Sequence, residues 1–235
     1  MTKSQSKNKS LIIIQARVSS KRLPGKVLLP IEGIPSIILS VKRATNTGKD
    51  IIVATSNHRS DDKLVKLLKR EKIKYFRGNL NNVLSRFASI VKNLDPDKPI
   101  FRLTADNVLP DGKILDEMEK ELIKKKIQYL QCGKNSGLPY GVSAELTKAK
   151  YLTEANLKSK TKYEKEHVTP YIKKKYKIHY FLKNKNYQME KHRCTIDTIN
   201  DYKLIKKVFK NLGSQSININ YKVLVNRIKK LSSIN

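Results

Sequence analysis

Short apolar runs separated by amphipathic stretches dominate the hydrophobic pattern of the chain. Residues 11–16 read Leu-Ile-Ile-Ile-Gln-Ala, a run typical of a strand buried on both faces of a parallel sheet. Similar runs occur at 51–54 and 100–103, and apolar residues repeat with helical spacing between them, as at 61–68. This alternation predicts a three-layer α/β fold, in which helices cover both faces of a mostly parallel, twisted sheet.

The same pattern assigns elements to the rest of the chain. Residues 1–9 are polar and without periodicity, so we expect a disordered tail, whereas no break in composition divides residues 10–235, so we expect one domain there. We expect strands at 11–16, 51–54, 74–76, 100–103, 129–130, 142–146, 178–182 and 193–196. We expect helices at 35–44, 61–68, 83–91, 111–126, 151–157 and 165–174, and another that starts at 197–200.

Charge adds a question about the partner. The 235 residues include 50 Lys and Arg against 20 Asp and Glu, a net charge of +30, which first suggests nucleic acid. However, the lysines form no single stripe, and Lys, Asn and Ile are abundant together, as AT-rich codons would produce. We therefore expect no specific nucleic-acid partner, and a nucleic-acid-binding basic protein remains only an alternative.

Apolar run length and cysteine spacing bear on location. No run approaches the roughly 18 apolar residues of a membrane-spanning helix. Cys132 and Cys194 form no spaced pair that would indicate a disulfide framework or a zinc site, and Cys194 reads as a small core residue. We therefore expect a cytoplasmic protein without a membrane segment.

The segment after the first predicted strand is the first candidate for chemistry. Ligands of open α/β sheets bind beyond the carboxyl ends of the strands. Residues 15–26 place Arg17, Lys21, Arg22 and Lys26 among Ser, Pro and Gly residues, so this loop can offer several cations and backbone N–H groups to a polyphosphate. It matches neither a P-loop nor a dinucleotide-binding motif. A solvated basic turn is the alternative.

Two acids follow predicted strands in distant parts of the chain. Asp106 comes after the strand at 100–103, and Asp197 comes after the one at 193–196. Two carboxylates with few other protein ligands suit Mg²⁺, which takes its remaining ligands from water and substrate phosphates. The alternative for each acid is a helix cap or a loop carboxylate. Arg77 and Arg102 have two interpretations each, either contacting phosphate or capping a strand.

Seven motifs occur in a defined order. They are Gln15-Ala-Arg17-x-Ser-Ser-Lys-Arg22-Leu-Pro-Gly-Lys26, Val53-Ala-Thr-Ser56, Phe76-Arg-Gly78, Val83-Leu-x-Arg-Phe87, Arg102-Leu-Thr-x-Asp106, Glu166-His-Val-Thr-Pro-Tyr171 and Thr195-x-Asp197-Thr. Together they resemble the acylneuraminate and KDO cytidylyltransferase family, closest to its SpsF-like branch of spore coat polysaccharide biosynthesis. The resemblance covers residues 11 to about 212.

The resemblance implies a Rossmann-like, GT-A-like nucleotidyltransferase fold. It implies transfer of CMP from CTP, or of the nucleoside monophosphate of another NTP, to a sugar, sugar acid or related anionic acceptor, with release of pyrophosphate, for surface glycan synthesis. It also implies a homodimer and an acceptor or dimerisation region at 133–183. The implied site residues are Arg17 and Lys26 for catalysis; Gln15, Ala16, Arg17, Lys21, Arg22, Lys26, Arg77, Arg102 and Asp106 for the nucleotide; Tyr140, Ser143, Glu145 and His167 for the acceptor; and Asp106 and Asp197 for Mg²⁺.

Three positions depart from the family pattern. Ser19 and Ala105 stand where relatives usually carry glycine, and Ser143 stands where they carry aspartate. A non-catalytic nucleotide-binding or scaffold protein is therefore the alternative to an enzyme. His167 has two interpretations as well, either an acceptor-site base or a residue ordered by the turn that Pro170 indicates.

Overall fold

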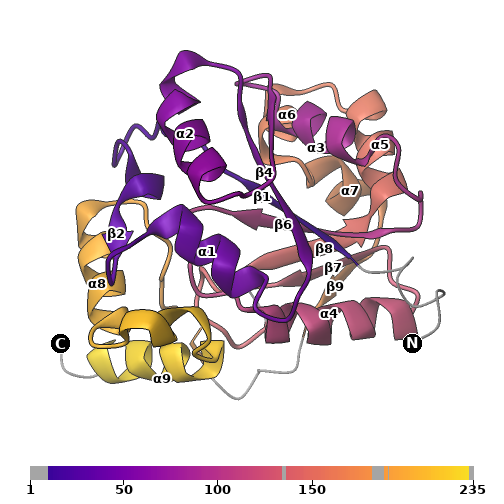
Figure 1. The fold of residues 1–235 in the computed structure, drawn as a ribbon. Helices are drawn as coiled ribbons and strands as arrows, with labels where there is room; N and C mark the ends of the chain where they lie inside the picture. The colour runs from indigo at the N-terminus through magenta and orange to yellow at the C-terminus, as the bar shows by residue number, and fades with distance from the viewer. Residues whose placement is uncertain (1–9, 134–135, 182–187, 190, 233–235) are drawn as a thin grey trace.

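The computed structural model describes residues 10–133, 136–181, 188–189 and 191–232 (Figure 1). The predicted tail at 1–9 and part of the predicted region at 133–183 lie outside the described residues. In the part of the chain that the structure describes, no helix is long and apolar enough to cross a membrane.

A seven-stranded sheet forms the middle layer, in the order β5-β4-β1-β6-β8-β7-β9. Strands β5, β4, β1 and β6 run parallel to one another. Strand β8 is antiparallel to both of its neighbours, β6 and β7, and β9 is parallel to β7. The strands are β1 (Leu11–Gln15), β4 (Asp50–Ser56), β5 (Tyr75–Gly78), β6 (Pro99–Thr104), β7 (Tyr129–Cys132), β8 (Ala144–Lys148) and β9 (Ile178–Tyr180), and a separate two-stranded ribbon pairs β2 (Pro30–Ile31) with β3 (Ile34–Pro35).

Strand β1 lies at the centre of the parallel part, which explains its uninterrupted apolar sequence. Ile12 and Ile14 pack into the core on one face of the sheet, whereas Leu11 and Ile13 pack into the core on the other. Gln15, the last residue of β1, pairs with Ala54 of β4 on one side and Thr104 of β6 on the other. The carboxyl ends of three strands therefore meet at one edge.

Helices cover both faces of the sheet, as predicted (Figure 1). The first face carries α1 (Ser36–Ala44), α2 (Asp62–Arg70), α4 (Gly112–Lys124), α8 (Ile199–Phe209) and α9 (Tyr221–Ser232). The second face carries α3 (Val83–Val91), α5 (Ala149–Lys158) and α7 (Pro170–Lys175), with α6 (Lys162–His167) just before α7. This arrangement confirms the predicted α/β class.

Two predicted elements are wrong. The segment 193–196 forms no strand but a single bridge, from Arg193 to Tyr140. The reason is that its backbone bonds Tyr140 at one end and Asp106 at the other, instead of one strand along its length. The predicted helix at 165–174 is two helices, α6 and α7, interrupted at Val168. Val168 has φ 71° and ψ −54°, and the N–H of Thr169 donates to the carbonyl of His167 at 2.8 Å, which closes a γ-turn.

Candidate active site

The loop that follows β1 runs along the carboxyl edge of the sheet. Ala16 continues the pairing of β1, since its N–H donates to the carbonyl of Ala54 at 3.1 Å. The loop closes on itself where the N–H of Gly25 donates to the carbonyl of Val18 at 3.1 Å. It ends in a short 3-10 helix at Lys26–Leu28. The cationic loop is therefore a folded turn that begins and ends beside the sheet.

Asp61 is fully buried and ties this loop to β4. Its Oδ1 accepts from the N–H of Val18 at 2.7 Å. Its Oδ2 accepts from the hydroxyl of Thr55 and the N–H of Ser56, each at 3.1 Å, and from the Ser56 hydroxyl. Asp61 was not among the predicted site residues, because an acid at the start of a helix is usually explained by the helix dipole. Its position shortly after a buried strand was the available signal.

Lys26 brings the two predicted metal ligands together. Its Nζ donates to Asp106 Oδ2 at 3.1 Å, to Asp197 Oδ1 at 2.9 Å and to the carbonyl of Ile196 at 2.8 Å. Asp106 lies just beyond β6, and Asp197 lies just before α8. The residues come from three distant parts of the chain and meet at the carboxyl edge of the sheet.

Two guanidinium groups also contact Asp197. Arg22 lies 2.8 Å from Oδ1, and Arg193 donates to Oδ2. Arg193 also donates through Nε to Thr195 Oγ1 at 2.8 Å, and its guanidinium lies 5.5 Å from the centroid of the Tyr140 ring. Arg193 was not predicted; its position four residues before a candidate metal ligand was the only signal in the sequence. We call Lys26, Asp106, Asp197, Arg22 and Arg193 the Asp197 cluster.

A glycine sets how closely the segment 192–197 packs against the loop before β8. Tyr140 donates through its N–H to the carbonyl of His192 at 2.8 Å, and Cys194 donates to the carbonyl of Tyr140 at 2.7 Å. Gly141 has φ 121°, and a Cβ there would lie 2.7 Å from Cys194 Sγ and 2.8 Å from the Cys194 carbonyl carbon. Only a residue without a side chain fits this contact.

A second ionic cluster lies on the α7 side of the sheet. Glu145 accepts from Arg102 at 2.9 Å, from Lys173 at 2.8 Å and from the Thr169 hydroxyl at 2.9 Å. Arg102 also donates through Nε to Gln15 Oε1 at 3.1 Å. Burial acts to raise the pKa of Glu145, but Arg102 and Lys173 outweigh it and hold this pKa at about 2. We call these five residues the Glu145 cluster.

In the described structure, the side chains of Arg17, His167 and Arg77 make their contacts outside both clusters. Arg17 lies 3.5 Å from Glu166 of α6, and both side chains are half-exposed. His167 is exposed, and its ring packs against Tyr163 with 4.5 Å between the centroids. Arg77 donates through Nε to the Ser56 carbonyl at 2.9 Å.

Two of the three departures from the family pattern have simple local explanations. Ala105 is buried, and its side chain packs into the hydrophobic core on the first face of the sheet, so its methyl group does not project from the strand ends. Ser143 accepts from the N–H of Gly141 at 3.3 Å and belongs to the turn before β8. Lys21 is exposed at the rim of the loop.

The oxygen ligands of the Asp197 cluster fit a magnesium ion that is bound partly by the protein and partly by substrate phosphates. Asp106 Oδ2 and Asp197 Oδ1 converge on one cation, which here is the ammonium of Lys26. No group of three or more His, Cys, Asp or Glu side chains in the described residues could hold a metal ion. Two protein carboxylates completed by water and phosphate oxygens is a usual arrangement for Mg²⁺.

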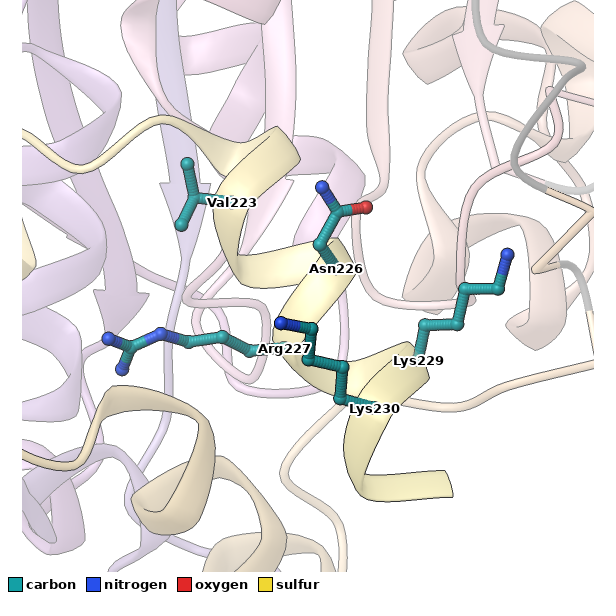
Figure 2. A pocket seen from close by; sticks show the side chains of 5 residues that line it. All are labelled: Val223, Asn226, Arg227, Lys229 and Lys230. Carbon is teal, nitrogen blue, oxygen red and sulfur yellow. The ribbon is translucent and has the colours of Figure 1, made fainter. Parts of the chain in front are cut away.

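A depression of about 420 Å³ on α9 lies outside both clusters (Figure 2). It is lined by Val223, Asn226, Arg227, Lys229 and Lys230, and none of these is a predicted site residue. Arg227 donates to the carbonyls of Val208 and Lys210, each at 3.1 Å, so it connects α9 to the end of α8. A structural role accounts for this arginine.

The structure thus combines a mostly parallel sheet with a cationic loop and two converging carboxylates at the strand ends, where open α/β proteins bind their ligands. The family model of the cytidylyltransferases matches residues 11–228. The chain belongs to the cytidylyltransferase family and is a CTP-dependent nucleotidyltransferase.

Known proteins are similar to this chain along most of its length. An uncharacterised protein of Methanocaldococcus jannaschii is 34% identical over 212 residues, which cover 88% of this chain and 86% of that protein. The spore coat polysaccharide biosynthesis protein SpsF of Bacillus subtilis is 30% identical over 218 residues, covering 88% and 89%. A cytidylyltransferase structure from Leptospira borgpetersenii has a TM-score of 0.84 and 31% identity, with 96% of each chain covered. The resemblance seen in the sequence motifs is confirmed.

Proposed function

We propose that the chain transfers CMP from CTP to the hydroxyl of a sugar acid, for the synthesis of a surface polysaccharide. The observation that carries the proposal is the Asp197 cluster, which places one lysine and two carboxylates at the strand ends of a cytidylyltransferase. The relative named for spore coat polysaccharide biosynthesis supports the pathway, and the motif resemblance to acylneuraminate and KDO cytidylyltransferases supports the acceptor.

In this reaction an acceptor oxygen forms a bond to the α-phosphorus of CTP while the bond to the bridging oxygen breaks. Pyrophosphate leaves with the electrons of the broken bond, and the proton of the acceptor hydroxyl passes to water. Arg17, Arg22 and Lys26 are part of the loop that follows β1. There they can bind the triphosphate and stabilise charge on the leaving pyrophosphate. Asp61 orients this loop through its bond to Val18.

Asp106 and Asp197 would hold Mg²⁺, which would supply neutralising charge to the triphosphate. Arg193 contacts Oδ2 of Asp197, so Oδ1 stays turned toward Lys26. Hydrogen bonds that orient a ligating carboxylate commonly raise metal affinity. On the acceptor side, Tyr140 and Arg193 form an exposed aromatic and cationic pair next to Asp197, which suits a sugar ring that carries a carboxylate.

Pyrophosphate release tests the proposed function directly. The wild-type chain is incubated with Mg²⁺, each of the four NTPs in turn, and a panel of sugar acids and matched neutral sugars. We expect turnover with CTP and a sugar acid, and little with the neutral sugars. Turnover only with a neutral acceptor would overturn the proposed acceptor class.

The non-catalytic alternative makes the opposite prediction for Asp106. Asp106→Asn should reduce turnover at least about 100-fold if this carboxylate serves the reaction. A scaffold role would instead be supported if the wild type bound CTP without releasing pyrophosphate and Asp106→Asn bound CTP with the same affinity as the wild type.

A further inference from the structure

The ammonium of Lys26 has its hydrogen-bonding capacity filled within the protein. An ammonium carries three donors, and Lys26 directs them to Asp106 Oδ2, Asp197 Oδ1 and the Ile196 carbonyl at 3.1, 2.9 and 2.8 Å. Its side chain is only 13% exposed. In this conformation the lysine has no donor left for a phosphate, although its position in the loop after β1 is that of a phosphate-binding group.

The two carboxylate oxygens that Lys26 contacts are those that face each other across the cluster. A magnesium ion held by Asp106 and Asp197 needs oxygens at about 2 Å from one point. The ammonium now lies between the two side chains. The metal ion and the ammonium therefore compete for the same two ligands.

We propose that Lys26 is the resident counter-ion of the metal site and leaves it only when metal and triphosphate arrive together. This inference rests on the proposed function, because it takes Asp106 and Asp197 as the metal ligands. Lys26 keeps the two carboxylates together in the free enzyme. When it leaves, the oxygens of the triphosphate become its new acceptors, and the metal takes over the carboxylates.

Burial explains why the two ligands must act together. A metal ion alone would drive a nearly buried ammonium away from three acceptors without supplying others, which is unfavourable for an unpaired charge. If Lys26 left to bind the triphosphate alone, Asp106 and Asp197 would lose the cation that Lys26 supplies to them. Only the metal complex of the nucleotide satisfies both sides, so the free enzyme should bind divalent metal weakly.

The other cations of the cluster do not replace Lys26. Arg22 and Arg193 both contact Asp197, but within the described structure the cationic contact of Asp106 is with Lys26. Replacing Lys26 by a neutral residue leaves Asp106 beside an Asp197 that remains oriented by two guanidinium groups. Such a variant should gain a metal site in the absence of nucleotide.

The experiment measures Mn²⁺ binding to the nucleotide-free protein by electron paramagnetic resonance. Lys26→Met is compared with the wild type, and Lys66→Met on the exposed face of α2 is the matched control. We expect Lys26→Met to bind one Mn²⁺ at least tenfold more tightly than the wild type and the control. Adding Asp106→Asn to Lys26→Met should abolish the gain. Lys26→Gln repeats the measurement if the methionine variant fails to fold.

Equal Mn²⁺ affinity in the wild type and in a folded Lys26 variant would overturn the inference. So would a gain that survives Asp106→Asn, since the ion would then lie elsewhere. The assay contains neither CTP nor acceptor, so its result is independent of turnover. Pyrophosphate release without any gain at Lys26→Met would refute this inference alone, whereas a gain without pyrophosphate release would refute only the proposed reaction.

Discussion

The Asp197 cluster and the Glu145 cluster each centre on a carboxylate that contacts more than one cation, but they differ in how those cations are held. The cations on Asp197 include Arg22 and Arg193, whose side chains are 62% and 47% exposed. The third, Lys26, is 13% exposed. The cations on Glu145 are Arg102, which is 14% exposed and faces it across paired strands, and Lys173, which is 33% exposed. A ligand from solvent can replace partners of the first kind, whereas the second kind acts as part of the sheet.

This difference separates a ligand-binding role, proposed for Asp197, from a structural role, expected for Glu145, which the sequence does not distinguish. The same motif resemblance implies a site role for both acids. In the structure, both oxygens of Glu145 already accept from side chains of the protein, on β6 and α7. Asp197 accepts from the nearly buried Lys26 as well, but its other two cations, Arg22 and Arg193, reach it from the protein surface. The acceptor-binding role of Glu145 stays a prediction, and its structural role can be tested first.

The largest effect should come from breaking the Glu145 cluster. Glu145→Ala leaves Arg102 and Lys173 without their shared carboxylate. Removing one partner of a buried ion pair costs about 3–5 kcal/mol, and because Lys173 is 33% exposed we expect a loss of about 3 kcal/mol. Urea denaturation measures the free energy of unfolding. Asp97→Asn is the matched control, because Asp97 also contacts two lysines but is exposed. Similar small losses for both variants would show that the Glu145 cluster does not stabilise the fold.

Acid should weaken the Glu145 cluster in a defined window. The pKa of Glu145 falls from 4.5 to about 2 on folding, so its contribution is complete above pH 4.5 and is lost as the pH decreases toward 2. The contribution is on the order of 3 kcal/mol. Unfolding free energies of the wild type and Glu145→Gln, measured between pH 7 and 2, should converge in this window. Parallel curves would contradict the depressed pKa.

Asp61 should affect both stability and nucleotide binding, because it anchors the loop that supplies cations to the Asp197 cluster. Asp61→Asn turns an amide donor toward groups that are themselves donors, at an expected loss of about 1–3 kcal/mol. We also expect KM for CTP to rise more than kcat falls. Asp50→Asn, at the exposed start of β4, is the control. An unchanged KM would show that Asp61 has only a structural role.

The smallest change in stability should come from Arg193. Arg193→Met leaves Asp197 with Lys26 and Arg22, so we expect a loss below about 1 kcal/mol. The position of Asp197 Oδ2 is nevertheless no longer fixed, and kcat/KM for CTP should fall several-fold. Arg193→Lys should recover part of the loss. A stability loss as large as that of Glu145→Ala would remove the distinction between the two clusters.

Local patterns predicted the parallel half of the molecule well. The run at 11–16 gave the central strand because burial on both faces leaves a continuous apolar signal. The segment at 193–196 alternates in sequence like a strand, yet Thr195 is buried together with Cys194 and Ile196, and the segment forms only one bridge. The alternation of polar and apolar residues reports neither which side chains this segment buries nor what lies beside its backbone.

The candidate site was predicted only as far as its motifs reach. The motifs contain Lys26, Asp106 and Asp197, and the structure brings these residues together. Asp61 and Arg193 were not predicted. The role of Asp61 depends on its contact with Val18, which is distant in the sequence, and the four-residue spacing of Arg193 and Asp197 does not by itself indicate a contact. The interruption at Val168 was not predicted either, because a valine in the sequence does not indicate a γ-turn with positive φ.

The absent side chain of Gly141 has a consequence for how this enzyme can change. Gly141 touches no predicted metal ligand, but the tight contact of its backbone with Cys194 sets where the segment ending in Asp197 lies. Selection or mutagenesis that introduces even alanine there would misplace a carboxylate without altering any group that binds substrate. A library that diversifies the turn before β8 to obtain new acceptors should therefore keep residue 141 constant and vary its neighbours.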